Sequence, residues 1–211
     1  MKNVRALLFD IDGTLLDTSE FIFQATEYAM KVCGYPVPSR NDIASTAGIS
    51  FPGFYIKLAG ENADVGKLME THWAFQYENF HLAKVYPNTA ETLKKLKEKG
   101  YRLAAVTARS KKTSHQTLKD AGIFQFFDTV VSLEDAKEPK PNPAPLLKAL
   151  DILNETPVKA AMVGDSHLDI EAGKNAGMKT VRATYGFHKE KMHDPEPDYF
   201  IDDIRDLLEI L

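Results

Sequence analysis

Two aspartates lie two positions apart, directly after an apolar segment near the start of the chain. The segment, residues 4–9, has the composition of a buried strand, and it is followed by Asp10, Asp12, Gly13 and Thr14. Because side chains two apart in an extended chain point to the same side, Asp10 and Asp12 can face one reacting atom. One carboxylate could attack an electrophile while the other carries the proton. Gly13 allows a tight exit from the strand, and Thr14 offers a hydroxyl and a backbone N–H to an anion.

The same short motif also occurs in plain turns and in calcium-binding loops. An EF-hand loop needs further oxygen ligands and a closing glutamate, whereas Leu15 and Leu16 follow the motif here. A calcium loop is therefore a poor interpretation, and a plain turn remains open from this motif alone.

A second apolar segment also ends in carboxylates. Residues 158–163 have the pattern of a buried strand, and Asp165 and Asp169 follow at the start of an expected helix. In an open α/β sheet, ligands bind outside the carboxyl ends of the strands. The side chains of Asp10 and Asp165 and the carbonyl of Asp12 could therefore form an oxygen-rich site of the kind that Mg²⁺ prefers.

A third apolar segment, residues 102–106, ends at Thr107, and a helix is expected to begin near Ser110. The Thr107 hydroxyl and the backbone N–H groups of Ala108 and Arg109 could bind phosphate oxygens at this helix start. Ser110 is expected to act as an ordinary helix cap as well.

Lys140 lies in a loop whose backbone is largely fixed by three prolines, Pro139, Pro141 and Pro143. A lysine in a loop is usually solvated surface. The place of this loop before the strand that leads to Asp165 instead favours a cation that neutralises phosphate.

Four motifs thus occur in order along the chain: residues 10–14, Thr107, Lys140 and residues 164–169. With them the chain resembles the haloacid-dehalogenase (HAD) superfamily of phosphatases, in its phosphoglycolate phosphatase-like branch, over essentially its whole length. Four motifs in order are far more specific than any one of them. The resemblance implies an α/β fold, in which a Rossmann-like parallel sheet core has helices on both faces and carries an inserted α-helical cap.

The resemblance also implies a role for each motif residue. By this likeness Asp10 is the nucleophile, Asp12 is the general acid and base, and Thr107 and Lys140 bind the phosphoryl group. The expected reaction passes through an aspartyl-phosphate on Asp10.

The same likeness implies a Mg²⁺ cofactor. Asp165 is the expected ligand, together with Asp10 and Asp12. Asp169 is expected to orient Lys140 or a metal-bound water.

The chain divides into two parts by its pattern. Residues 18–84 lack a strand pattern and favour helices over residues 19–32, 51–58 and 65–80, whereas alternating strands and helices resume near Tyr86. We therefore expect an α/β core of residues 1–17 and 85–211 and a helical insert of residues 18–84. Candidate hinges lie at residues 17–18 and 83–86.

The helical insert is expected to contact the substrate through the loop at residues 46–51. Gly48 would permit close backbone approach, and Thr46, Ser50 and Tyr55 are candidate substrate contacts. The alternatives for the more distant candidates, Arg40 and Lys57, are solvated surface positions. The core of the insert is expected to comprise Met69, Trp73, Phe75 and Phe80.

The composition of the chain limits its expected partners and cellular compartment. The 211 residues are 44% hydrophobic, and the net charge is −4 with no basic block, so a nucleic-acid partner is not expected. No apolar run approaches membrane-spanning length and no signal peptide precedes residue 4, so we expect a cytoplasmic protein without a membrane partner. The single cysteine, Cys33, excludes an internal disulfide and fits a reducing compartment.

Cys33 also raises the possibility of a cysteine phosphatase, which holds phosphate in a Cys-x5-Arg loop. Six residues separate Cys33 from Arg40, one too many, and they do not form a glycine-rich loop. Burial as a small apolar residue is the better interpretation.

The expected function is a Mg²⁺-dependent phosphatase, monomeric or homodimeric, that acts on a small phosphorylated metabolite. By analogy, phosphoglycolate comes first among substrates, followed by pyrophosphate, nucleoside monophosphates and sugar phosphates. Three alternatives stay open: a phosphomutase of the β-phosphoglucomutase type, a phosphonate hydrolase, suggested by Lys57, and a non-catalytic metabolite-binding protein. The intact Asp10, Asp12, Lys140 and Asp165 argue against the last.

Overall fold

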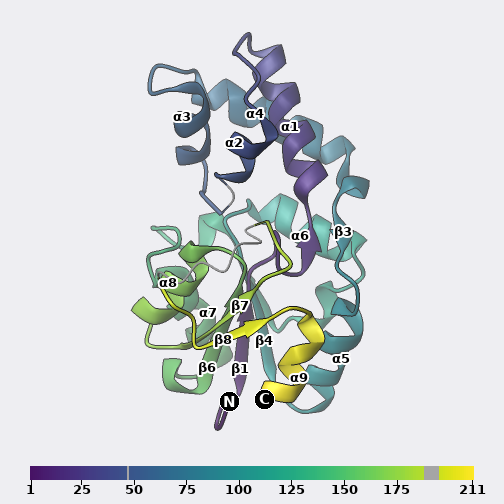
Figure 1. Cartoon of the computed structure of the whole chain (residues 1–211), viewed down its shortest axis with the longest axis vertical. Helices are drawn as coiled ribbons and strands as arrows, with labels where there is room; N and C mark the ends of the chain where they lie inside the picture. The colour runs from purple at the N-terminus through teal and green to yellow at the C-terminus, as the bar shows by residue number, and fades with distance from the viewer. Residues whose placement is uncertain (47, 188–194) are drawn as a thin grey trace.

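A six-stranded parallel sheet forms the centre of the larger part of the molecule (Figure 1). The computed structural model describes residues 1–46, 48–187 and 195–211. The strand order is β5-β4-β1-β6-β7-β8, and every neighbouring pair is parallel. The strands are β1 (Ala6–Phe9), β4 (Arg102–Val106), β5 (Thr129–Val131), β6 (Ala160–Gly164), β7 (Lys179–Ala183) and β8 (Tyr199–Ile201).

Helices cover both faces of this sheet, and the central strands β1 and β6 are apolar along their length for that reason. Leu7 and Phe9 of β1 belong to the cluster that packs against α5 (Thr89–Glu98), α6 (Lys111–Asp120) and α9 (Leu207–Ile210). Ala6 and Leu8 point to the other face, which α7 (Ala144–Leu153) and α8 (His167–Asn175) cover. Figure 1 shows α7 and α8 on one side of the sheet and α5 and α9 on the other.

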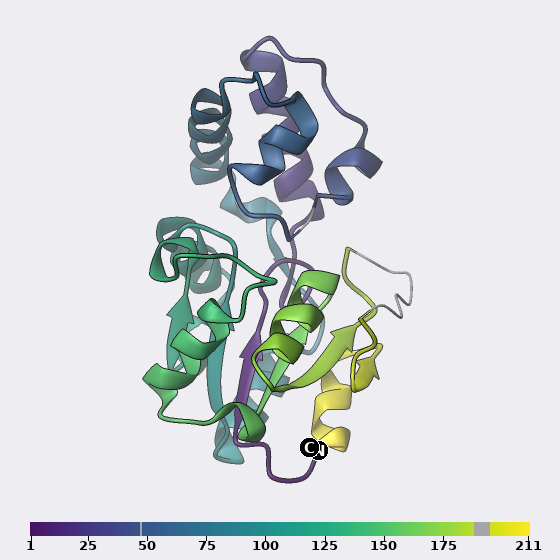
Figure 2. The same cartoon turned by 90° about the vertical axis from the view of Figure 1, so that its left-hand side faces the viewer.

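Four helices lie in the described part of the helical insert, and α1 packs mainly against α4. They are α1 (Ser19–Val32), α2 (Arg40–Ala44), α3 (Gly53–Ala59) and α4 (Val65–Glu78), and the 3₁₀ turn η1 (Phe80–Leu82) follows them. The insert has an apolar cluster of its own, made of Ala29, Met30, Ile43, Phe54, Tyr55 and Leu68. In Figures 1 and 2 the insert stands over one end of the sheet, while both chain termini lie at the opposite end.

A short two-stranded ribbon lies where the chain passes between the sheet and the insert. In it β2 (Leu16–Asp17) pairs antiparallel with β3 (Lys84–Val85). The expected boundaries of the insert, at residues 17–18 and 84–85, fall on this ribbon. The sequence did not predict it, because strands of two residues carry no readable alternation.

The α/β fold expected from the sequence, with a parallel sheet surrounded by helices, is confirmed. Several element boundaries differ from the sequence expectation by one or two residues. The strand expected over residues 4–9 begins at Ala6, and the helix expected over residues 51–58 spans Gly53–Ala59. The strand expected from residue 158 begins at residue 160, because Pro157–Lys159 form the 3₁₀ turn η4. The helix expected to reach residue 80 ends at Glu78, before η1. The remaining 3₁₀ turns are η2 (Phe124–Phe126), η3 (Leu133–Asp135) and η5 (Ile204–Asp206).

None of the helices in the described ranges is long and apolar enough to cross a membrane.

Candidate active site

Three adjacent central strands bring the motif residues to one edge of the sheet. Asp10 follows β1, Thr107 follows β4 and Asp165 follows β6, and β1 lies between the other two strands. The Asp10 N–H still donates to the carbonyl of Val163 at 2.9 Å, so its position is fixed by the strand ladder. The order of the strands reverses at β1, which is where α/β sheets bind ligands.

Lys140 joins two of these carboxylates. Its Nζ donates to Asp10 Oδ1 at 2.7 Å, to Asp169 Oδ1 at 2.5 Å and to the Val106 carbonyl at 3.1 Å. The side chain is buried, which by itself would lower the pKa of Lys140, but the two carboxylates raise it above its ordinary value. Lys140 is therefore an ammonium group held directly beside Asp10.

Asp169 is fixed by the start of α8. Its Oδ2 accepts hydrogen bonds from Ser166 Oγ at 2.6 Å and from the Ser166 N–H at 3.1 Å, in a capping box. Its other oxygen accepts from Lys140. In this structure Asp169 thus orients Lys140, which is one of the two roles that the family resemblance implied.

Asp10, Asp165 and Asp169 form a buried acidic cluster, with one oxygen of each within 4.8 Å of the others. Burial raises the pKa of Asp10 to about 7, and Asp169 and Asp12 add to this effect. Burial, followed by the charges of Asp169 and Asp10, also raises the pKa of Asp165 well above its ordinary value. Three carboxylates face one ammonium, and the excess negative charge and the oxygen donors fit a hard divalent cation such as Mg²⁺.

Two glycines leave room for Asp165. Its Oδ2 accepts a hydrogen bond from the Phe187 N–H at 2.8 Å. A Cβ on Gly13 or on Gly186 would overlap the Asp165 carboxylate. Gly13 also has a φ of +81°, as expected for a tight exit from β1.

The side chain of Asp12 lies apart from this cluster. Its Oδ1 accepts from Thr18 Oγ1 at 2.5 Å, and Arg109 binds both oxygens, with Nε to Oδ2 at 2.7 Å and Nη2 to Oδ1 at 2.5 Å. The guanidinium also lies over the Phe21 ring, 4.8 Å from its centroid. Burial would raise the pKa of Asp12, but the charge and hydrogen bonds of Arg109, with Thr18, bring it below its ordinary value. In this arrangement the Asp12 carboxylate is engaged by Arg109 and Thr18, so Asp12 could coordinate the predicted cation through its backbone carbonyl.

The hydroxyl groups of the two motif threonines, Thr107 and Thr14, differ in their hydrogen bonds. Thr107 is buried beside Lys140, and its Oγ1 accepts from the Arg109 N–H at 3.2 Å, so that N–H is already used within the loop. Thr14 is fully buried, its N–H lies 3.4 Å from the carbonyl of Ile11, and its Oγ1 has no hydrogen-bond partner in the described ranges. Ser110 accepts from the Thr113 N–H at 3.3 Å and caps α6, as expected.

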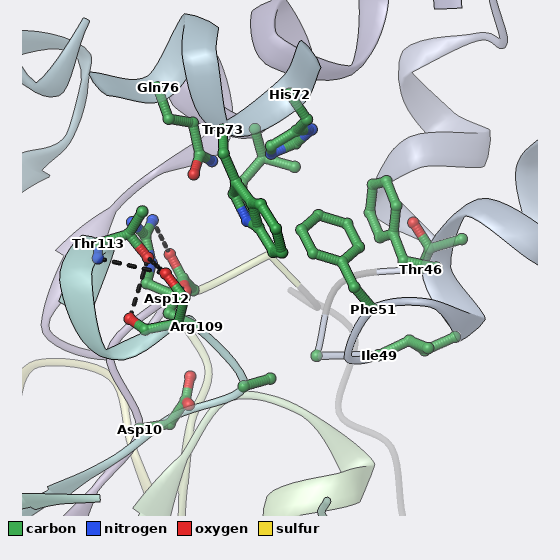
Figure 3. Close-up of a pocket in the computed structure, with 15 residues that line it drawn as sticks. Asp10, Asp12, Thr46, Ile49, Phe51, His72, Trp73, Gln76, Arg109 and Thr113 are labelled. Carbon is green, nitrogen blue, oxygen red and sulfur yellow. Dashed lines mark hydrogen bonds and ion pairs between the residues drawn. The ribbon is translucent and has the colours of Figure 1, made fainter. Parts of the chain in front are cut away.

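A cavity separates this edge of the sheet from the helical insert (Figure 3). Its volume is about 630 Å³, including the solvent at its mouth. On the core side it is lined by Asp10, Asp12, Ala108, Arg109, Ser110 and Thr113. On the side of the insert it is lined by Ile22, Thr46, Gly48, Ile49, Phe51, Phe54, His72, Trp73 and Gln76. Two carboxylates with different partners thus lie together at the base of the cavity, where one could act as a nucleophile and the other as a proton carrier.

The family model of the haloacid dehalogenase-like hydrolases matches residues 7–183 of this chain. The chain belongs to this family. It is 39% identical to "Pyrophosphatase PpaX" of Bacillus velezensis, over 99% of this chain and 97% of that protein. It is 34% identical to the protein of the same name from Bacillus mycoides, again over 99% and 97%.

Solved structures agree with this assignment. A predicted phosphoglycolate phosphatase from Haemophilus somnus has a TM-score of 0.92 at 28% identity, and the match covers 100% of this chain and 99% of that one. A haloacid dehalogenase-like hydrolase from Streptococcus pneumoniae, 23% identical, shares the fold with a TM-score of 0.88 over 100% and 99%. The expectation of an enzyme of this family, a hydrolase of phosphoric esters, is therefore confirmed.

Two of the residues that the sequence singled out in the insert line the cavity of this hydrolase. Thr46 is buried there, and its hydroxyl donates to the Ile43 carbonyl at 2.6 Å. Gly48, with a φ of +87°, lies so close to α8 that a Cβ would be 3.3 Å from Ser166 Oγ. The close approach expected of Gly48 was to the substrate, and it stays a prediction, while Ala47, between the two, lies outside the described residues.

The other candidates from the insert have partners elsewhere. Tyr55 is fully buried within the insert, and its hydroxyl pairs with His72 Nδ1 at 2.8 Å. Arg40 is exposed and forms ion pairs with Glu20 and Glu27. Lys57 Nζ donates a hydrogen bond to the Ser45 carbonyl at 3.2 Å. These three and Ser50 are not among the lining residues.

Sequence reasoning missed the part of the cavity wall that α4 supplies, which is His72, Trp73 and Gln76. Trp73 was expected in the core of the insert, but its ring lines the cavity, while Met69 packs on the insert's cluster as expected. Phe75 packs on Tyr28 and Phe80 on Phe21, outside that cluster. The spacing of positions 72, 73 and 76 places them on one face of a helix. This pattern is equally typical of a face that packs in a hydrophobic core, so it does not by itself indicate a cavity wall.

Proposed function

We propose that this hydrolase is a Mg²⁺-dependent phosphatase that transfers the phosphoryl group of a small phosphate monoester to Asp10 and then to water. The observation that supports it best is the position of Asp10. A buried carboxylate lies at the base of a cavity, with the Lys140 ammonium 2.7 Å away and a second, separately held carboxylate, Asp12, on the same cavity. Nucleophile, neutralising cation and proton carrier are thus combined.

In the first step a carboxylate oxygen of Asp10 attacks phosphorus, and the bond from phosphorus to the leaving oxygen breaks. Asp12 gives its proton to the leaving alkoxide, which departs as an alcohol. Because Arg109 holds the pKa of Asp12 low, the pair of Asp12 and Arg109 has to loosen when Asp12 carries this proton.

In the second step water attacks the phosphorus of the aspartyl-phosphate. Asp12 accepts the proton from this water, inorganic phosphate leaves, and the Asp10 carboxylate is regenerated. The low pKa of Asp12 suits this step, since the group starts as a carboxylate.

The phosphoryl oxygens carry negative charge throughout and need fixed positive partners. Lys140 supplies one positive partner, and the Thr107 hydroxyl adds a neutral hydrogen-bond donor. The side chains of Asp10 and Asp165 and the carbonyl of Asp12 would hold Mg²⁺, which when bound supplies further positive charge to the same oxygens.

The substrate class is proposed as a small phosphorylated metabolite, handled in the cytoplasm by a monomer or homodimer. The names of the relatives, pyrophosphatase and phosphoglycolate phosphatase, provide two specific candidates for comparison.

The test is phosphate release from a panel of phosphate esters, with Mg²⁺ and with chelator. We expect release only with Mg²⁺, inhibition by Ca²⁺, whose coordination is larger and looser, and loss of turnover in Asp165→Asn. Full activity in chelator would contradict the proposed role of the acidic cluster.

A further inference from the structure

The wall of the cavity that faces Asp10 is largely apolar and aromatic. An in-line attack by Asp10 sends the leaving group away from Asp10, toward the helical insert. There the cavity is lined by Ile22, Ile49, Phe51, Phe54 and Trp73. The leaving group would therefore contact aromatic rings and aliphatic side chains of the insert.

The aromatic part of this wall is fixed by its own packing. The Phe51 ring lies 5.3 Å from that of Phe54, 5.1 Å from that of His72 and 5.8 Å from that of Trp73, each in an edge-to-face arrangement. Tyr55 stacks behind Phe51 at 5.4 Å. Rings held in this way need little ordering when a ligand binds.

The wall carries no free positive charge among the residues that the structure describes. Arg109 is the one lining residue with a cationic side chain, and both oxygens of Asp12 engage it. Burial, with the charge of Arg109, lowers the pKa of His72 to about 3, so its imidazole is neutral. A second anionic group on the substrate would meet no cationic side chain on the described part of the insert's wall, and burial without such a partner is costly.

One neutral polar group does face the cavity. Gln76 lines it with only 5% of its surface exposed, and its amide forms no hydrogen bond to any group in the described ranges. Figure 3 shows this amide, and the Trp73 ring beside it, extending from α4 toward Asp12 and Arg109. An amide that lines a cavity in this way can bind a hydroxyl, carbonyl or amide of a ligand.

We propose that the leaving group of the substrate is an uncharged alcohol with an aromatic ring, or a comparable apolar body, and a neutral polar substituent for Gln76. The inference rests on the proposed phosphatase function and narrows its substrate class. The proposed leaving group differs from those of pyrophosphate and phosphoglycolate, the substrates that the names of the relatives indicate. Pyrophosphate would place a second phosphate against this wall, and phosphoglycolate would place a carboxylate there.

Trp73 provides a direct binding test, because it is the single tryptophan of the chain. We would titrate the enzyme with Mg²⁺ and benzylphosphonate, methylphosphonate or phosphonoacetate, and follow the tryptophan emission. Benzylphosphonate should change the emission and bind about tenfold or more tightly than the other two, as ring contacts of this size allow. Phosphonoacetate binding as tightly as benzylphosphonate would overturn the inference.

Kinetics provide the second test, with benzyl phosphate, ethyl phosphate, pyrophosphate and 2-phosphoglycolate as substrates. Benzyl phosphate should have the highest kcat/KM, and Trp73→Ala should reduce its advantage over ethyl phosphate about fivefold or more. Trp73→Phe should retain most of the advantage. The control, Tyr28→Ala, removes an exposed ring on α1 that packs on Phe75 outside the cavity, and should leave all four values unchanged.

The two tests separate the inference from the proposed function. Mg²⁺-dependent turnover that favours pyrophosphate or phosphoglycolate would overturn the inference and leave the phosphatase function intact. Preferential binding of benzylphosphonate without turnover of any of the four substrates would support the apolar character of the cavity and contradict the phosphatase function.

Discussion

Asp10 and Asp12 are chemically identical residues with opposite environments. Asp10 is buried among carboxylates, and burial raises its pKa to about 7, although Lys140 opposes this. Asp12 is only partly buried, and Arg109 and Thr18 hold its pKa below its ordinary value. This difference supports separate roles, in which Asp10 forms a covalent bond and Asp12 exchanges protons.

At the residue scale, Asp12→Ala should affect alkyl phosphates more than aryl phosphates. An alkoxide needs a proton to leave, whereas a nitrophenolate leaves unaided, so the loss in kcat should be about tenfold or more greater for ethyl phosphate than for nitrophenyl phosphate. Both substrates would be measured in wild type and variant. An equal loss on both would remove Asp12 from the general-acid role.

At the scale of elements, three neighbouring strands carry the chemistry and a distant loop completes it. Asp165 follows β6, but the N–H that binds it belongs to Phe187, beyond β7. Gly186, beside Phe187, is buried and leaves space for the Asp165 carboxylate. The metal ligand expected from the sequence is thus oriented by residues that the sequence did not point to.

Gly186→Ala should therefore weaken Mg²⁺ binding. The added methyl would overlap Asp165, and displacing a group that orients a ligand typically weakens metal binding about 10- to 100-fold. The measurement is the Mg²⁺ concentration for half-maximal activity, with folding checked by circular dichroism. In the matched control, Gly66→Ala, the nearest atom to the new Cβ lies 3.7 Å away and no change is expected. An unchanged Mg²⁺ requirement in Gly186→Ala would contradict the assignment of Asp165.

The elements were more predictable than the cavity. Buried parallel strands appear in sequence as continuous apolar runs, so β1, β4 and β6 and the residues that follow them could be placed from sequence alone. Lys140 could be proposed as a phosphate-binding cation, but its contact with Asp169 depends on how α8 docks on the sheet. The wall of the cavity could not be predicted, because an aromatic such as Trp73 on one face of a helix has the same pattern whether it faces a core or a ligand.

At the scale of the whole molecule, the insert and the core meet across the cavity and are joined through the β2–β3 ribbon. Asp10 and Asp12 line the cavity from the core, while Trp73 and Gln76 line it from the insert. We therefore expect the chemistry to depend on the core and substrate recognition to depend on the insert.

Mg²⁺ should stabilise the whole protein in a pH-dependent way. The folded pKa of Asp10 is raised to about 7, so its contribution to stability in the metal-free protein is present below its ordinary pKa and is lost as pH rises through about 7. Mg²⁺ binds the ionised carboxylates and should offset this loss. The increase in Tm with saturating Mg²⁺ should be larger at about pH 8 than at about pH 5, and smaller in Asp10→Asn. An increase that does not depend on pH would show that the cation binds elsewhere.

The central claim is that Asp10 becomes covalently phosphorylated. The most direct measurement is an acid quench of the enzyme during turnover of a ³²P-labelled phosphate ester with Mg²⁺, followed by peptide mapping. We predict label on the peptide that contains Asp10, released by hydroxylamine as expected for an acyl phosphate, and neither label nor turnover in Asp10→Asn. Label on another residue, or an Asp10→Asn variant with activity within about tenfold of wild type, would contradict the account.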